Sequence, residues 1–262
     1  MPYKIYFKFL FLALFLSCFT SKKSTTNDNQ SLIQAFKIKL DTVTLFDSVR
    51  QRRIPLAFYT SKTKEGNDKK EVVIFSHGYG GNKGGDYLAY SYLTQYLAAN
   101  GYFVVSIQHE LPSDEPIAMT GNFQETRRPN WERGVQNILF VINTLKKTKP
   151  DLDFQHLTLI GHSNGGDMSM LFVHTYPTLL DKIISLDNRR APFPRLKKPK
   201  IYSLRSSDQV ADKGVLLDKI EQDIYGVKII KLDSIKHNDM DDSGTAAQHL
   251  EINKYILNFL RT

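Results

Sequence analysis

The sequence predicts an α/β protein in which a mostly parallel β-sheet is covered by helices on both faces. Three observations lead to this prediction. Short continuous apolar runs such as residues 72–75 have the length of strands buried on both faces. Longer stretches such as residues 131–145 carry apolar residues at helical spacing. The two patterns alternate along the chain, an order typical of parallel sheets.

The elements follow one another in a regular order. Residues 42–46 and 54–59 alternate apolar with polar side chains and predict two strands joined by a turn at 47–51. Residues 109–130 are polar and contain three prolines, so we expect an irregular segment there. The buried strands are expected at 72–75, 102–107, 157–160, 183–186, 201–204 and 227–232, and the helices at 82–99, 131–145, 167–174 and 245–260.

The first residues have the composition of an export signal. Lys4 and Lys8 precede an apolar run that is too short to span a membrane. Cys18 follows directly in the order L-F-L-S-C, which resembles a bacterial lipobox with bulky residues before the serine. We expect a signal peptide at 1–17, a lipid anchor on Cys18 and a polar tether over 18–31, with an ordinary secretory signal as the alternative. This predicts a lipid-anchored protein of the bacterial cell envelope, on the periplasmic side.

The remaining residues, 32–262, have the composition of one globular domain. The chain has 262 residues, of which 41% are hydrophobic and 24% charged, enough to bury a core. Its net charge of +8 comes from scattered lysines and arginines rather than a basic helix with interleaved aromatic residues. We therefore expect no nucleic-acid partner. The single cysteine excludes an intramolecular disulfide, and a monomer is expected.

A candidate nucleophile lies in the segment GHSNGG, residues 161–166. The pattern G-x-S-x-G is weak by itself, but here a predicted strand precedes it and a predicted helix follows. A sharp strand-to-helix turn lifts a serine hydroxyl above the edge of a sheet, and Gly161 and Gly165 leave the room that this turn needs. Ser163 is therefore the expected nucleophile. The helix that begins beside it favours developing negative charge.

The base and the oxyanion hole follow from position in the same way. His237 is the only histidine in the loop after the last predicted strand, where it would take the serine proton and later protonate the leaving group. The segment F-S-H-G-Y-G-G follows the first buried strand, and its glycines let the backbone approach a substrate. We expect the main-chain N–H groups of Asn164 and Tyr79 to form the oxyanion hole, with Gly80 as the fallback for the second donor.

The acid that orients the histidine has two candidates. Asp208 lies in a short polar loop one strand before the histidine, which is the commoner layout. Asp187 ends the preceding strand, and it also keeps the order serine, aspartate, histidine. We expect Asp208 to be the acid and keep Asp187 as the alternative. The other aspartate is expected to have a structural role, for example pairing with Arg189 or Arg190.

Together these motifs resemble the α/β-hydrolase superfamily over nearly all of residues 36–262. The resemblance is carried by H-G-x-G-G, G-H-S-x-G-G, S-x-D-x-V-A and a late histidine, in that order. More narrowly, DSVRQRRIPLAFY at 47–59 is similar to the opening of dienelactone-hydrolase-like esterases and of relatives of platelet-activating-factor acetylhydrolase. VVSIQHE and LDNRRAPFP are similar to the second group.

The resemblance implies an α/β-hydrolase fold and a serine esterase. It divides on the acid, because the acetylhydrolase relatives carry it where Asp187 stands and the dienelactone hydrolases where Asp208 stands. Dienelactone hydrolases also use a cysteine nucleophile, whereas Ser163 stands here, so their lactone chemistry is not expected to transfer.

Three classes of function are consistent with this site. We expect a serine hydrolase that cleaves small-molecule carboxylic esters through an acyl-enzyme, with no metal or organic cofactor. Residues 109–130 would form a lid or pocket wall, with Met119, Phe123 and Trp131 as candidate lining residues. The alternative is a non-catalytic cell-envelope binding lipoprotein on the same scaffold, although an inert scaffold has no need of serine, histidine and acid together. A peptidase or acyltransferase is a third class, but a peptidase would usually show a larger cap or an added β domain.

Overall fold

An eight-stranded sheet in the order β1-β2-β4-β3-β5-β6-β7-β8 organises the computed structural model. The structure describes residues 1–3, 37–61 and 69–262. β1 pairs antiparallel with β2, and β2 antiparallel with β4, whereas every later pair of neighbours is parallel. The strands are β1 (Ile38–Asp47), β2 (Arg52–Ser61), β3 (Glu71–Ser76), β4 (Phe103–Ile107), β5 (Asp153–His162), β6 (Lys182–Leu186), β7 (Lys200–Arg205) and β8 (Lys228–Lys231).

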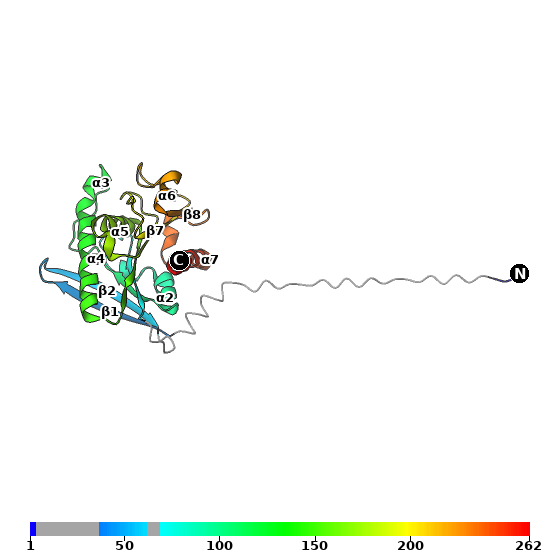
Figure 1. Ribbon diagram of the computed structural model, residues 1–262, viewed down its shortest axis with the longest axis horizontal. Helices are drawn as coiled ribbons and strands as arrows, with labels where there is room; N and C mark the ends of the chain where they lie inside the picture. The colour runs from blue at the N-terminus through cyan, green and yellow to red at the C-terminus, as the bar shows by residue number, and fades with distance from the viewer. Residues whose placement is uncertain (4–36, 62–68) are drawn as a thin grey trace.

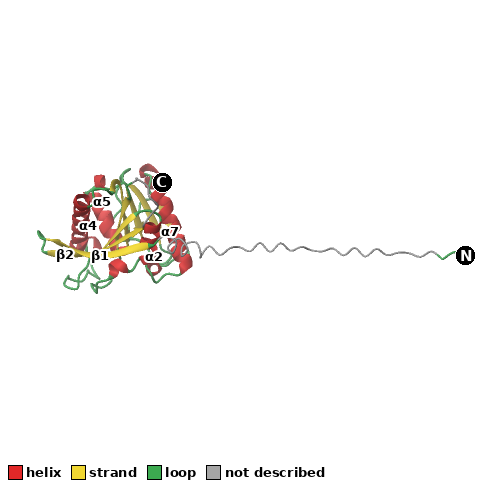
Figure 2. Cartoon of the chain, turned by 90° about the horizontal axis from the view of Figure 1, so that it is seen from below, coloured by secondary structure: helices red, strands yellow, loops and turns green. Residues whose placement is uncertain are grey.

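Helices cover both faces of this sheet, as predicted (Figures 1 and 2). α4 (Arg128–Thr148) and α5 (Ser163–Thr175) pack on one face, and α2 (Ser91–Ala99) and α7 (Ala246–Arg261) on the other. Each face has its own apolar core, so the central strands are buried on both sides. This burial explains the short continuous apolar runs in the sequence.

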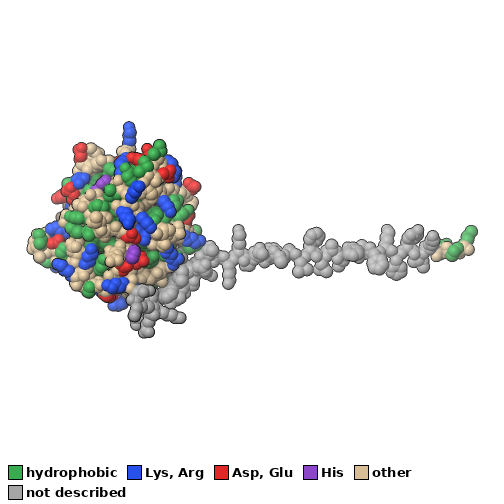
Figure 3. Space-filling view, viewed as in Figure 1, with side chains coloured by type: hydrophobic (Ala, Val, Ile, Leu, Met, Phe, Trp, Pro, Cys, Tyr) green, Lys and Arg blue, Asp and Glu red, His purple; other side chains and the backbone are tan. Residues whose placement is uncertain are grey.

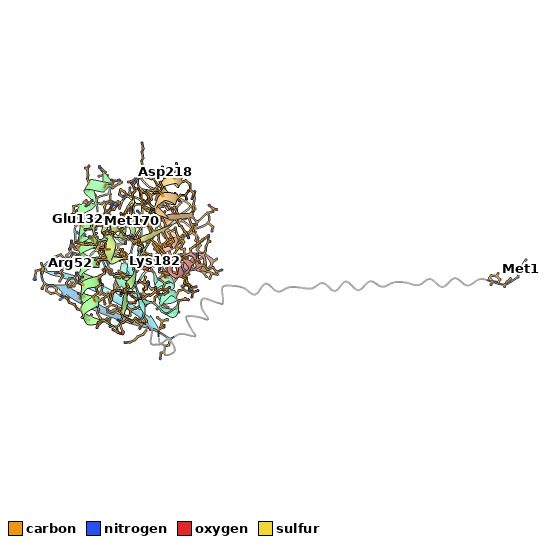
Figure 4. All side chains as sticks on the ribbon, viewed as in Figure 1. Met1, Arg52, Glu132, Met170, Lys182 and Asp218 are labelled. Atoms are coloured by element: carbon orange, nitrogen blue, oxygen red, sulfur yellow. The ribbon has the colours of Figure 1, made fainter. Side chains whose placement is uncertain are left out.

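Helices α4 and α5 bury most of their apolar side chains, and α4 exposes most of its charged ones. Met170 of α5 is fully buried between helix and sheet, whereas Glu132 of α4 is exposed (Figure 4). Lysine and arginine side chains are spread over the surface with acidic ones between them (Figure 3). The scattered distribution predicted from the sequence is therefore visible on this face.

The register of the two strands beneath the site is regular. β5 and β6 are parallel neighbours, and His162, the last residue of β5, lies opposite Leu186, the last residue of β6. The residues that follow these two therefore emerge side by side at the carboxyl edge of the sheet. This edge is where open α/β sheets form their ligand sites.

Three stretches differ from the sequence-based expectation. The predicted helix at 82–99 is a 3-10 turn, η1 (Asp86–Leu88), followed by α2, because Gly84 and Gly85 have φ of 80° and 86°, in the left-handed region. Two short helices inside polar stretches were not predicted, because each is too short to show a periodic pattern. They are α3 (Phe123–Thr126) and α6 (Lys219–Tyr225).

The predicted membrane attachment involves residues that the structure does not describe. Cys18 lies outside the described residues, as do the tether at 19–31 and all but the first three residues of the predicted signal peptide. Within the described ranges, no helix has both the length and the apolar character needed to cross a bilayer.

Candidate active site

Ser163 lies on a sharp turn between β5 and α5. Its φ of 51° falls in the left-handed region, where a residue with a side chain is strained. A Cβ at Gly161 would come closer than 3.0 Å to the carbonyl oxygen of Gly165 across the turn, and a Cβ at Gly165 would come as close to the carbonyl oxygens at the end of β3. Both glycines are therefore required by close backbone packing, and the strand–turn–helix context predicted for Ser163 is present.

His237 connects this serine to a carboxylate. Its Nε2 lies 2.9 Å from Ser163 Oγ, and its Nδ1 lies 2.6 Å from Asp187 Oδ2. His237 begins the short η3 (His237–Met240) after β8, in the loop where the sequence placed the base. The three side chains form a continuous hydrogen-bonded chain in which the serine can lose its proton to the imidazole.

The carboxylate beside the imidazole is Asp187 rather than the expected Asp208, so the prediction for Asp208 is corrected. Asp208 Oδ1 accepts a hydrogen bond from the main-chain N–H of His237 at 2.7 Å. The difference has a structural cause. Asp187 comes directly after β6 with a φ of 55°, which turns its side chain toward the imidazole, whereas Asp208 follows β7 by three residues and reaches the histidine backbone instead.

Asp187 is held by several donors. It is fully buried. Its Oδ1 accepts from the main-chain N–H of Ser206 at 3.1 Å and pairs with Arg205 Nη2 at 2.8 Å, while Oδ2 also accepts from Ser206 Oγ at 2.7 Å. Burial raises the pKa of Asp187, but the hydrogen bonds from His237 and Ser206 and the charge of Arg205 outweigh it and lower the pKa to about 2. The carboxylate is ionised near neutral pH.

The loop after β3 lies against the nucleophile. A Cβ at Gly78 would be 3.3 Å from Ser163 Cβ, which places this loop beside the turn. The main-chain N–H of Gly78 donates to Tyr90 Oη at 3.0 Å, so the next N–H along the chain, that of Tyr79, is the candidate oxyanion donor in this loop. Asn164 stands in the first turn of α5, where a main-chain N–H has no acceptor within the helix. The structure thus brings both expected segments to Ser163.

His162 was given no role from the sequence, yet it packs against the base. Its ring centroid lies 4.7 Å from that of His237, and its Nδ1 lies 2.7 Å from Tyr90 Oη. Because Tyr90 Oη accepts from Gly78 N–H, its own proton points to His162 Nδ1. Burial and the neighbouring charge of His237 lower the pKa of His162 to about 3. His162 is therefore neutral and links the Gly78 loop to the base.

The expected lid residues have different environments. Trp131 is buried, and its Nε1 donates to Asn164 Oδ1 at 2.9 Å. Phe123 packs against two guanidinium groups, with its ring centroid 4.6 Å from Arg127 Cζ and 3.9 Å from Arg190 Cζ. Met119 is exposed. Of the three, only Trp131 contacts a residue next to the nucleophile.

Among the described residues, no group of three or more histidine, cysteine, aspartate or glutamate side chains is placed to hold a metal ion. At the carboxyl edge of the sheet, a serine hydroxyl, an imidazole and a buried carboxylate form one hydrogen-bonded chain. Fold and site together define an α/β hydrolase.

The family comparison agrees with this class. Residues 67–199, just over half of the chain, match the family model described as serine aminopeptidase, S33. The chain therefore belongs to this hydrolase family. The matched stretch includes Ser163 and Asp187 and ends before Asp208 and His237. No curated protein sequence matches the chain significantly.

Solved structures share the fold at low sequence identity. A thermostable esterase superposes with a TM-score of 0.61 and 18% identity, covering 87% of this chain and 63% of that one. A dienelactone hydrolase-like promiscuous phosphotriesterase, P91, from metagenomic libraries has a TM-score of 0.62 and 16% identity, with 86% and 98% covered. An acylaminoacyl peptidase from Pyrococcus horikoshii has a TM-score of 0.58 and 16% identity, with 86% and 41% covered. The chain thus spans less than two thirds of the esterase and of the peptidase.

Proposed function

We propose that the protein is a serine hydrolase that cleaves carboxylic esters through an acyl-enzyme intermediate. The observation that carries this proposal is the unbroken chain of hydrogen bonds from Ser163 through His237 to Asp187. Nucleophile, base and orienting acid lie in the order and geometry of the serine–histidine–aspartate template. The left-handed backbone at Ser163 supports it, because strain of this kind collects at functional sites.

The reaction would proceed in two halves. Ser163 Oγ attacks the ester carbonyl while His237 Nε2 takes its proton, and the tetrahedral oxyanion is held by the N–H groups of Asn164 and Tyr79. The carbon–oxygen bond to the alcohol then breaks as His237 returns the proton to the leaving oxygen. Water repeats the sequence on the acyl-enzyme and releases the carboxylic acid. Asp187 keeps the imidazole oriented and stabilises its charged form throughout.

Labelling by a fluorophosphonate tests the proposal directly, because this probe reacts with an activated serine. We expect the full-length chain to be labelled and to hydrolyse p-nitrophenyl acetate, and Ser163→Ala to do neither while unfolding at the same temperature. A folded wild type that takes no label and turns over no ester would contradict the proposal. That result would favour a binding lipoprotein on a hydrolase scaffold.

Amide substrates are a second candidate, favoured by two of the comparisons. The matching family is described as serine aminopeptidase, and one of the similar structures is an acylaminoacyl peptidase. Ester cleavage is preferred because the dienelactone hydrolase-like structure is matched over 98% of its length, against 41% for that peptidase. Aminoacyl p-nitroanilides tested beside p-nitrophenyl esters of equal acyl length would separate the two. A higher kcat/KM for the anilides would reverse the preference.

We propose further that a lipid on Cys18 holds the protein in the bacterial cell envelope. The support is the sequence alone, namely a charged start and a short apolar run directly before the only cysteine. Expression in a bacterium with labelled palmitate should give labelled wild type in the membrane fraction and unlabelled, released Cys18→Ser. Wild type that is secreted without label would instead indicate an ordinary secretory signal.

A further inference from the structure

The side chain of Asn164 is held more firmly than a backbone donor would require. It is 2% exposed, and all its polar positions are used. Its Oδ1 accepts from Trp131 Nε1 at 2.9 Å, and its Nδ2 donates to Glu110 Oε1 at 3.0 Å and to Asn130 Oδ1 at 2.8 Å. These partners come from the loop after β4 and from α4, so two separate parts of the fold converge on the residue that follows the nucleophile.

Glu110 is the unusual member of this cluster. It is 1% exposed, and its Oε1 accepts from Asn164 and, at 3.2 Å, from Asn130 Nδ2. Its Oε2 has no hydrogen-bond partner among the described residues. A buried acid without compensation is costly, so its presence calls for a reason.

The nearest candidate cation does not supply a counter-charge. His77 Nε2 lies 3.8 Å from Glu110 Oε2. However, His77 Nδ1 lies 2.6 Å from the carbonyl oxygen of Gly78 and so carries a proton there, while Nε2 accepts from the main-chain N–H of His109 at 3.0 Å. The imidazole is thus a neutral tautomer. The partners that satisfy Glu110 are the two amide groups, and the firmer of those contacts is to Asn164.

Building on the proposed function, we infer that Glu110 is a positioning residue for the oxyanion hole and acts through the side chain of Asn164. The Asn164 Cα carries both this side chain and the main-chain N–H that would face the oxyanion. In the first turn of α5 that N–H has no acceptor within the helix to fix it. Three hydrogen bonds on the side chain restrict rotation of the peptide between Ser163 and Asn164, and so aim its N–H at the reacting oxygen.

This inference predicts a particular kinetic signature. Glu110→Ala removes an acceptor and loosens the donor without deleting it. The loss in kcat should therefore be about 10-fold, smaller than the roughly 100-fold to 1,000-fold that follows complete loss of a donor. KM for p-nitrophenyl acetate should change by less than about 2-fold, because the oxyanion forms only in the transition state. Glu110→Gln keeps an acceptor oxygen and should restore kcat to within about 3-fold of wild type.

A matched control separates positioning from general stability. Ser61 at the end of β2 is also buried, and its Oγ donates to the carbonyl oxygen of Ala98 at 2.7 Å. Because β2 is antiparallel to β4, Ser61 lies near the start of β4, at the edge of the sheet opposite to Ser163. Ser61→Ala should lower the unfolding temperature and leave kcat unchanged. A boronic acid, which forms a tetrahedral adduct with serine, should bind Glu110→Ala about 10-fold more weakly and Ser61→Ala as it binds wild type.

A double-mutant cycle provides the decisive test. Asn164→Ala keeps the main-chain N–H and removes the side chain through which Glu110 would act. Glu110→Ala should then cost less than about 2-fold in kcat in the Asn164→Ala background, against about 10-fold in wild type. Equal losses in both backgrounds, or no loss in wild type, would overturn the positioning role while leaving the esterase intact. If Glu110→Ala does not fold, Asn130→Ala removes the neighbouring acceptor and must show the same kcat loss and the same cycle.

Failure of the proposed function gives a different result. A wild type that turns over no ester and takes no fluorophosphonate overturns both the esterase and the role of Glu110. A wild type that is active while Glu110→Ala matches Ser61→Ala in kcat and in boronic-acid affinity overturns the role of Glu110 alone.

Discussion

Replacing Asp187 and Asp208 separately by asparagine tests which carboxylate serves the imidazole. In Asp187→Asn the side-chain oxygen must face Arg205 Nη2 and the N–H of Ser206, because both are donors that need an acceptor. The new NH2 group then takes the place of Oδ2 and faces His237 Nδ1. It donates to Nδ1, and the imidazole proton moves to Nε2. In that tautomer His237 cannot accept the proton of the serine.

The expected loss is large because the wrong tautomer removes general-base catalysis altogether. We expect kcat for p-nitrophenyl acetate to fall by about 1,000-fold to 10,000-fold in Asp187→Asn, which corresponds to about 4 to 5.5 kcal/mol of transition-state stabilisation. In Asp208→Asn the side-chain oxygen can still accept the main-chain N–H of His237, now without the help of a charge. This variant should keep kcat to within about 10-fold, since a single hydrogen bond contributes about 1 kcal/mol.

Initial rates and the second-order rate of fluorophosphonate labelling should be measured for both variants beside wild type, with unfolding temperatures as the control for structure. The reasoning fails if Asp208→Asn loses more activity than Asp187→Asn while both remain folded. In that case the acid assignment favoured by the sequence would be right and the contact of Asp187 with the imidazole would be incidental.

Three further perturbations concern the scaffold of the site. Gly165→Ala should give little soluble protein, because its Cβ would come closer than 3.0 Å to the carbonyl oxygen of His77. Tyr90→Phe should lower the free energy of unfolding by about 2 kcal/mol in urea titrations, because the partly buried N–H of Gly78 loses its acceptor and His162 Nδ1 loses its donor. Asp187 should make stability fall in acid. Its pKa is about 2 in the folded chain against 3.8 ordinarily, so a contribution of about 2 kcal/mol is complete above about pH 5 and is lost as the pH falls toward 2.

Each of these has a simple check. Gly214→Ala, at a φ of 82° but with open space around it, should cost only about 1 kcal/mol, and equal damage at both glycines would contradict the packing argument. Tyr90→Phe should lower the free energy of unfolding and leave KM nearly unchanged. The acid-dependent loss should be about 2 kcal/mol smaller in Asp187→Asn, and identical pH profiles would refute the assigned carboxylate.

The fold was largely predictable because buried parallel strands leave short apolar runs that few other structures produce. The helix predicted at 82–99 was too long, because the helical spacing of its apolar residues was given more importance than Gly84 and Gly85. The left-handed backbone at these two glycines is incompatible with an α-helix, so no helix can include them. The short α3 and α6 could not be found, because fewer than two turns do not establish a period.

The site was predictable where it depends on chain order and less so where it depends on side-chain direction. Ser163 and His237 follow specific strands, and the structure brings their side chains together. The left-handed φ at Asp187 turns its side chain toward His237, and this decides between Asp187 and Asp208. No residue pattern predicts this backbone conformation for an aspartate. The contacts of Glu110 could not be predicted for another reason. They join Glu110 to residues of α4 and α5 that lie 20 and 54 positions away along the chain.

The pairing of β5 with β6 has a consequence for how the site can be lost. Ser163 and Asp187 each come one residue after the paired residues His162 and Leu186, so the ladder between two central strands sets their separation. A slip of one residue would move one of them by about 3.3 Å and turn its side chain to the other face. Such a slip requires opening the middle of the sheet, the part of a protein that exchanges its amide protons last. The spacing between Ser163 and Asp187 should therefore be lost only in the cooperative transition that opens the centre of the sheet.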